Sequence, residues 1–217
     1  MAEGRERRRW GGLAFAAGLL LLALGGWQMG SAAYLHAKAW LAQVLLAEAW
    51  AATLADGTPQ KPWPWADTAP VARLQVPALG VDQIVLAGVS GRSLAFGPGH
   101  LDGTARPGTR GHSVLSGHRD THFRFLQDLA PGTRLRIQKT DGRWQTYRVG
   151  SSSVIDAGEA RLALGTGRPV VTLVTCYPFD AITPGGPLRY LVSAEAELRR
   201  GPPRPRRPVI PAATDLF

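Results

Sequence analysis

The chain contains a single cysteine, Cys176, and it is the side chain best suited to act as a nucleophile. It follows the run Val170–Thr175, whose β-branched residues favour a strand, and it precedes Tyr177-Pro178. A cysteine inside a strand is usually a small buried hydrophobe, but a side chain at the end of a strand is accessible to a substrate. No intrachain disulfide can form. Cys176 is therefore an inert core residue, a link to another chain or a nucleophile.

Two partners that a reactive thiol requires also lie at expected strand ends. His118 follows the strand ending at Ser116, where its imidazole could lower the pKa of a thiol or carry protons. Arg189 opens a strand after the flexible pair Gly185-Gly186, and a guanidinium there could hold a carbonyl or an oxyanion. Taken singly, the two are an ordinary turn histidine and a solvated arginine. Their joint occurrence favours a catalytic site.

Two alternatives to a cysteine nucleophile, a metal site and a serine nucleophile, fit the sequence less well. His118 and His122 are four residues apart, as in helical zinc sites, and three further potential ligands are near in sequence, namely His100, His112 and Asp120. However, position 119 holds an arginine where a His-Glu-x-x-His site has its glutamate, and this charge disfavours a cation. Neither Ser90 nor Ser113 lies in a complete G-x-S-x-G nucleophile elbow. We therefore expect no metal.

Short β-favouring runs between turn signals must position these residues. Asp141-Gly142 is a hairpin signal, and helical pieces are few, with Arg92–Phe96 and Thr121–Leu129 the best candidates. This pattern predicts an all-β barrel or sandwich with minor helices rather than βαβ units. The expected strands are Val71–Val76, Val81–Ala87, His112–Ser116, Arg134–Gln138, Trp144–Val149, Val170–Thr175 and Arg189–Ala194.

The N-terminal segment predicts a membrane anchor. Residues 10–29 carry no charge over about 20 residues, the length that spans hydrocarbon. Four arginines precede this segment, so the positive-inside rule places the N-terminus in the cytoplasm and the rest of the chain outside. The small residues of Gly30–Ala33 leave a cleaved signal peptide as the alternative, although the apolar run is long for a signal.

The remaining segments complete the expected organisation. Ser31–Leu54 is rich in alanine and leucine and should form a second helix, too apolar for a solvated stalk, that packs on the membrane interface or the domain. Gly57–Trp65 is a proline-rich linker, and the Pro/Arg-rich tail cannot bury a face. We expect a cytoplasmic arm over 1–9, an anchor over 10–30, a helix and linker over 31–67, a β-domain over 68–198 and a tail over 199–217.

Composition restricts the function further. The chain is 45% hydrophobic, which is enough for a core, and its formal net charge is +9. The excess of basic residues lies in the N-terminal arm and the tail, while the segment between them is close to neutral. Basic ends of this kind favour membrane-surface contact over nucleic-acid binding.

Three separated motifs, in order, resemble those of the sortases, a family of membrane-anchored cysteine transpeptidases. Thr172–Cys176 matches their T-L-x-T-C signature, Ser116–Phe123 resembles the segment that carries their histidine, and Arg189 stands where their strand-borne arginine falls. The resemblance covers residues 68–195 and includes Gly97–Thr104. The N-anchored layout is most similar to the Gram-negative class, and the departure is His112, where relatives carry asparagine.

This resemblance implies a fold and a mechanism. The fold is an eight-stranded β-barrel. Cys176 attacks a carbonyl in the LPXTG-like C-terminal sorting signal of an exported protein, His118 protonates the departing amine, and Arg189 steadies substrate and oxyanion. An amine acceptor then releases the acyl-enzyme. Thr175 either binds substrate near the oxyanion or serves structural packing. The resemblance implies no cofactor and places the enzyme in the inner membrane with a periplasmic catalytic domain. The alternative is a non-enzymatic, membrane-anchored peptide-binding barrel.

Overall fold

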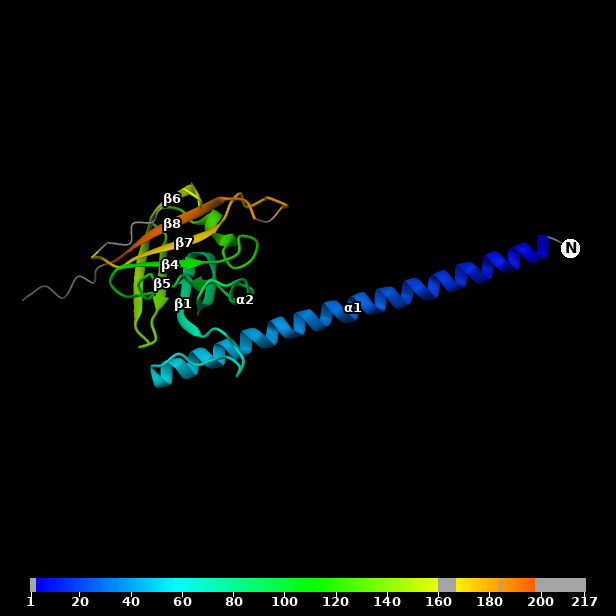
Figure 1. Ribbon diagram of the computed structural model, residues 1–217, viewed down its shortest axis with the longest axis horizontal. Coiled ribbons are helices and arrows are strands. Elements are labelled where there is room, and N and C mark those ends of the chain that lie inside the picture. The colour runs from blue at the N-terminus through cyan, green and yellow to red at the C-terminus, as the bar shows by residue number, and fades with distance from the viewer. Residues whose placement is uncertain (1–2, 160–166, 184, 198–217) are drawn as a thin grey trace, which may run out of the picture.

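The computed structural model describes residues 3–159, 167–183 and 185–197, except for the side chains of residues 3–9 and 11–17. It consists of a long helix, α1 (Glu3–Asp56), and a β-barrel that lies beside the C-terminal end of this helix (Figure 1). The tail expected over 199–217 lies outside the described residues.

Eight strands close into a barrel in the order β1-β2-β3-β4-β7-β8-β6-β5, as expected. Seven of them overlap the runs expected from the β-favouring pattern. The eighth, β3, has only two residues, pairs in parallel with β2 and antiparallel with β4, and completes the closure. The strands are β1 (Pro70–Val76), β2 (Val81–Ala87), β3 (Gly99–His100), β4 (His112–Ser116), β5 (Arg134–Gln138), β6 (Trp144–Asp156), β7 (Val170–Cys176) and β8 (Leu188–Ala196).

Strand β7 has β4 as its parallel neighbour on one side and β8 as its antiparallel neighbour on the other. Ser116 at the end of β4 pairs with Val174 of β7, and Cys176 pairs with Arg189 at the start of β8. Because parallel strands run in the same direction, the ends of β4 and β7 meet at one edge of the barrel, and β8 begins there. This edge brings the three sequence-predicted segments together.

The barrel core follows the two-residue alternation of its strands. In β7, Val171 and Leu173 are fully buried in the core, and Leu115 and Val192 fill the same interior from β4 and β8. Cys176 lies on the opposite face of β7 from these residues, so its side chain points out of the barrel. The alternation therefore presents the thiol to the surface.

The two expected N-terminal helices form one continuous helix of 54 residues. Its C-terminal part packs on the barrel through a stripe of buried side chains at helical spacing: Ala42, Leu46, Ala49, Trp50 and Thr53. Hydrogen bonds reinforce the contact, from Gln43 Nε2 to the Phe96 carbonyl oxygen (2.9 Å) and from Trp50 Nε1 to Gln138 Oε1 (3.3 Å). The second expected helix was predicted to pack on the membrane interface or on the domain, and its C-terminal part packs on the domain.

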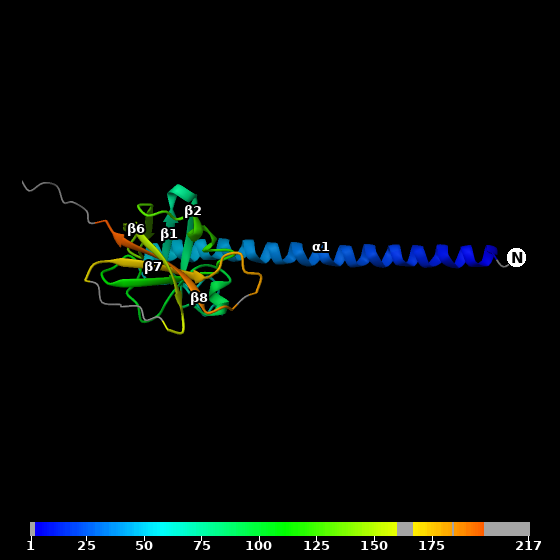
Figure 2. The same cartoon turned by 90° about the horizontal axis from the view of Figure 1, so that it is seen from above.

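The rest of α1 extends away from the barrel (Figures 1 and 2). Its described side chains between Leu19 and Met29 are exposed and, apart from Gln28, apolar, including Trp27. By length and composition, Gly18–Asp56 of this helix could cross a membrane. The remaining helices are short: α2 (Gly91–Leu94), and the 3-10 turns η1 (Pro77–Leu79) and η2 (Arg124–Asp128), the last lying where a helix was expected over Thr121–Leu129.

Candidate active site

Cys176 and Arg189 lie directly opposite each other at the open ends of β7 and β8. Both side chains are half-buried and lie on the outward face of their strands. The guanidinium of Arg189 donates from Nη1 to the carbonyl oxygens of Gly186 (2.6 Å) and Leu188 (2.9 Å). The guanidinium is therefore held by the backbone of its own loop, on the residue that pairs with Cys176 in the sheet.

His118 lies on the turn that follows β4, beside the end of β7. The Gly117 amide donates to the Val174 carbonyl oxygen (3.2 Å), which extends the β4–β7 ladder by one residue. The turn is closed by the Phe123 amide, which donates to the His118 carbonyl oxygen (2.9 Å). His118 and Cys176 each lie two residues beyond the register pair formed by Ser116 and Val174. Within the described residues, no hydrogen bond joins the His118 ring to the thiol.

A side-chain hydrogen bond links the two segments just before these residues. Thr175 is 1% exposed, and its Oγ1 donates to the Gly117 carbonyl oxygen at 2.7 Å. Because Thr175 points into the barrel, its hydroxyl is used there rather than on the outward face that carries Cys176. The hydroxyl thus fixes the turn bearing His118 relative to the strand bearing the thiol.

Arg119 connects the histidine turn to the loop between β7 and β8. Its Nη2 donates to the carbonyl oxygens of Ala181 (2.7 Å) and Thr183 (3.1 Å). One guanidinium thereby bridges the segment after the histidine and the segment after the cysteine. The loop is also braced by an aromatic cluster, with ring centroids 5.2 to 6.2 Å apart: Tyr177, Phe179 and Tyr190.

The turn packs tightly against the core at Gly117. A Cβ at this position would lie 2.8 Å from the ring of Phe123, whose side chain is fully buried. Glycine is therefore the residue that lets the backbone preceding His118 approach this ring.

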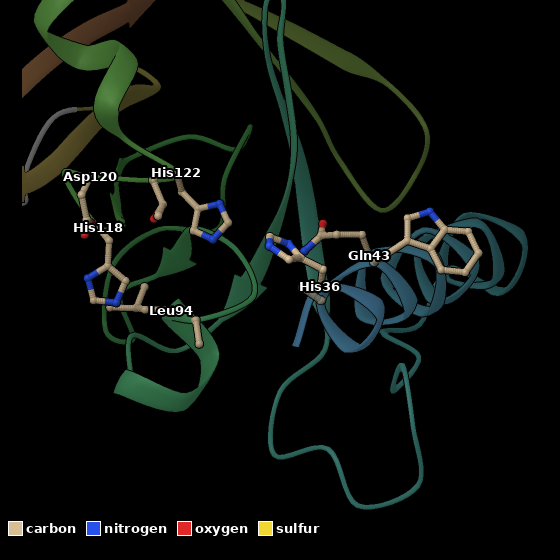
Figure 3. A pocket seen from close by; sticks show the side chains of 10 residues that line it. His36, Gln43, Leu94, His118, Asp120 and His122 are labelled. Atoms are coloured by element: carbon tan, nitrogen blue, oxygen red, sulfur yellow. The ribbon is translucent and has the colours of Figure 1, made fainter. Parts of the chain in front are cut away.

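A cavity of about 580 Å³ lies between the turn and α1. Figure 3 shows His36 and Gln43 of α1 on one side of it and His118, Asp120 and His122 on the other. Burial is the main cause that lowers the pKa of His122, and the nearby His118 lowers it further. The walls of the cavity therefore combine the helix and the histidine turn.

The structure thus brings Cys176, Arg189 and the turn of His118 to one edge of the barrel and buries Thr175 beside them. In the described part of the chain, no group of three or more His, Cys, Asp or Glu side chains is arranged to hold a metal ion. Sequence reasoning missed Arg119, which it treated only as a charge unfavourable to a metal. It also missed the role of the glycine before His118, although the Gly-His pair was a signal for a constrained turn.

Comparisons with known proteins identify one family. The family model of the sortase domain matches residues 74–197. Sortase D of Bacillus subtilis (strain 168) is 31% identical over 120 residues, which cover 55% of this chain and 60% of that protein. The chain therefore spans less than two thirds of the length of that curated relative.

Solved structures give the same result. Sortase C-1 of Actinomyces oris (formerly Actinomyces naeslundii) is 32% identical with a TM-score of 0.53, covering 59% of this chain and 73% of that one. Sortase A of Corynebacterium diphtheriae is 27% identical with a TM-score of 0.55, covering 64% and 66% respectively.

Proposed function

Because the chain belongs to the sortase family, whose members are cysteine transpeptidases that sort surface proteins, we propose that it cleaves an LPXTG-like sorting signal of an exported protein and transfers the product to an amine. The observation that carries the proposal is the pairing of Cys176 with Arg189 beside the turn of His118. These are a thiol, a guanidinium and an imidazole at one edge of the barrel.

In the first step, the thiolate of Cys176 attacks the backbone carbonyl carbon of the substrate. A carbon–sulfur bond forms and the carbon–nitrogen bond breaks, which gives a thioester. The leaving amine takes a proton from the imidazolium of His118. Outward orientation of Cys176 and the position of the histidine turn beside it support this division of roles.

Arg189 stabilises the oxyanion that develops on the attacked carbonyl. Charge-assisted hydrogen bonds from a guanidinium are stronger than neutral ones, and donors placed in advance avoid the cost of reorganisation. The backbone hydrogen bonds from Nη1 restrict the guanidinium beside Cys176. Thr175 supports substrate binding only indirectly: its buried hydroxyl donates to the Gly117 carbonyl oxygen and so positions the turn of His118.

We place this activity outside the cytoplasm on a membrane anchor. The exposed apolar side chains of α1 and the basic arm before them support a single-pass anchor over 10–30, a cytoplasmic arm over 1–9 and a barrel domain over 68–198 on the far side. In this arrangement, residues 31–67 join the anchor to the barrel. The enzyme is proposed to be of the Gram-negative class, in the inner membrane with its domain in the periplasm.

Intact mass measurement tests the reaction class. The full chain in detergent is incubated with a peptide that carries an LPXTG-like motif. The expected result is an adduct on Cys176 with the mass of the acyl fragment, absent in Cys176→Ala and strongly reduced in Arg189→Lys, which keeps the charge but loses the planar fork. Peptide binding that is unchanged in Cys176→Ala, with no adduct in the parent chain, would instead indicate a non-enzymatic peptide-binding barrel.

A further inference from the structure

We propose that the cavity between α1 and the turn of His118 binds the primary ammonium group of the acceptor, so that the anchor helix forms one wall of the acceptor site. The identity of the ligand as the acceptor rests on the proposed function. The presence of an ammonium site in the cavity is testable without it.

The position of the cavity follows from the role of His118. The histidine that protonates the leaving amine in the first step must take a proton from the incoming amine in the second, so both amines occupy the same side of the thioester. His118 is one of the residues that line the cavity, so an amine bound there lies beside the imidazole that must accept its proton. The opposite wall is formed by α1, through His36 and Gln43 (Figure 3) and also through Trp40.

The charge of the cavity favours a cation. Asp120 is the one acidic group among the described residues that line it, and these include no lysine or arginine. The side chain of Trp40 is 69% exposed, so its ring is available to an ammonium group, which indole faces attract. An anionic group, such as a phosphate, would meet the carboxylate of Asp120 without a fixed positive partner.

The histidines of the cavity are compatible with a bound cation. Burial lowers the pKa of His122, which keeps its ring neutral at neutral pH. In the proposed first step, His118 gives its proton to the leaving amine as the acyl-enzyme forms. His36 faces the turn from α1 (Figure 3). The site is thus most favourable to an ammonium group at the stage when the acceptor must bind.

The transfer step balances with these groups. The ammonium nitrogen loses two protons in becoming an amide nitrogen: one passes to water and one to His118. The nitrogen lone pair forms the new carbon–nitrogen bond as the carbon–sulfur bond breaks, and the electron pair of that bond returns to Cys176 as thiolate. The step therefore restores the thiolate and imidazolium with which the first step began.

Ligand-observed NMR tests the site directly on the full chain in detergent. The probes are triglycine amide, with an α-ammonium, and Nα-acetyl-lysine amide, with an ε-ammonium, which separate the two sources of this group. Nα-acetyl-triglycine amide is the neutral control. The ammonium probes should bind, and Asp120→Asn and Trp40→Ala should each weaken them by about threefold to fivefold, the range for an exposed ion pair or cation–π contact.

Matched variants outside the cavity control for charge and for aromatic area. Asp128→Asn removes an exposed acid from η2, and Trp65→Ala removes an exposed indole from the segment between α1 and β1. Both should leave the affinity for the ammonium probes unchanged. Equal binding of the neutral peptide, or affinity that is unchanged in Asp120→Asn and Trp40→Ala, would overturn the proposal.

A kinetic measurement then links the site to acyl transfer. The ratio of amide product to hydrolysis product is followed as the amine concentration is raised. Asp120→Asn should require about threefold to fivefold more amine for the same ratio. If no thioester forms but ammonium binding still depends on Asp120, the proposed transpeptidase function is wrong, whereas the ammonium site in the cavity is supported. If the thioester forms and the ratio does not respond to Asp120→Asn, the acceptor site is elsewhere.

Discussion

The hydroxyl of Thr175 donates a 2.7 Å hydrogen bond to the carbonyl oxygen of Gly117 inside the barrel. It joins the residue before the proposed nucleophile to the residue before the proposed general acid, although 58 positions separate them along the chain. The two proposed catalytic side chains are therefore fixed relative to each other by a contact that touches neither of them.

Thr175→Val should reduce both stability and activity. Valine keeps the shape of threonine but leaves the buried Gly117 carbonyl without this donor, which costs about 1–3 kcal/mol of the free energy of unfolding. Because the His118 turn then loses a fixed position, kcat/KM for thioester formation should fall more than about tenfold. Thr175→Ser, which retains a hydroxyl, should restore most of the rate. Equal activity of the valine and serine variants would show that the hydrogen bond does not position the site.

Gly117→Ala should displace the same turn by a steric route. The new Cβ would lie 2.8 Å from the Phe123 ring, which is fully buried and cannot swing into solvent. Overpacking of this kind costs about 1–3 kcal/mol, so the melting temperature should fall together with the rate of thioester formation. Phe123→Leu in the same chain should recover part of both losses.

Gly91→Ala is the matched control, since a Cβ there meets no atom within 4 Å. This variant should melt no lower than the parent and retain its rate. A Gly117→Ala enzyme that also behaves like the parent would mean that the turn tolerates the larger residue without moving.

Arg119→Ala should weaken substrate binding more than it weakens the chemical step. Without the two hydrogen bonds to Ala181 and Thr183, the loop between β7 and β8 loses its link to the histidine turn. We expect KM for the sorting peptide to rise by about threefold to tenfold, the effect of losing one or two partly exposed hydrogen bonds. Arg124→Ala, an exposed arginine of η2, controls for charge. A lower kcat with unchanged KM would contradict a role confined to the loop.

Much of the barrel could be predicted from the sequence because most of its strands carry a local signal. Runs such as Val81–Ala87 and Arg134–Gln138 have β-favouring side chains between turn residues, and their bounds agree with β2 and β5. Strand β3 could not be predicted in this way. Its two residues have no periodicity, and the strand exists only because β2 and β4 flank it.

The arrangement of the site was less accessible to sequence patterns. Strand ends could be assigned to Cys176 and Arg189 from local patterns, but their direct pairing depends on the register of β7 and β8. The approach of the His118 turn depends on parallel pairing of β4 and β7, for which no local pattern exists. Only the resemblance to family motifs indicated that the His118 turn would lie near Cys176. Motifs did not indicate that Arg119 would bind a loop more than 60 residues away.

Continuity of α1 was also missed, for a physical reason. The sequence around Gly30-Ser31 resembles a break because glycine and serine favour helix ends over helix interiors. However, no proline interrupts the segment before Pro59, and strong helix formers such as leucine, methionine and alanine flank Gly30-Ser31. These neighbours outweigh the weak local preference for a break.

Trp50→Ala should loosen this docking. The indole is 3% exposed and donates to Gln138 Oε1 at 3.3 Å. Truncation of a buried tryptophan costs about 3–5 kcal/mol, which should appear as faster amide hydrogen exchange over residues 42–54. Trp27→Ala, on the exposed apolar part of the helix, should not change exchange in that segment. If exchange over 42–54 is equally slow in both variants, the helix is held by other contacts.

Stability should fall as the pH is lowered through the range in which His122 titrates. Burial lowers the pKa of His122 below its ordinary value of 6.5, whereas the unfolded chain titrates at that value. Below about pH 7 the unfolded state therefore binds more protons than the native state, and the free energy of unfolding decreases with falling pH until the native histidine is also protonated. The pKa of Asp82 is lowered by its hydrogen bond to Arg73, but its effect lies below its ordinary value of 3.8, outside this window.

Two histidine variants test whether His122 causes this pH dependence of stability. Urea unfolding of the full chain in detergent is measured between about pH 5 and about pH 7.5, the window set by a lowered histidine pKa. His122→Gln should flatten the slope, since the variant has no group at that position that the unfolded state protonates first. His36→Gln removes an exposed histidine of α1 and should leave the slope as it is in the parent. An unchanged slope in His122→Gln would show that burial of this ring does not control the acid sensitivity of the fold.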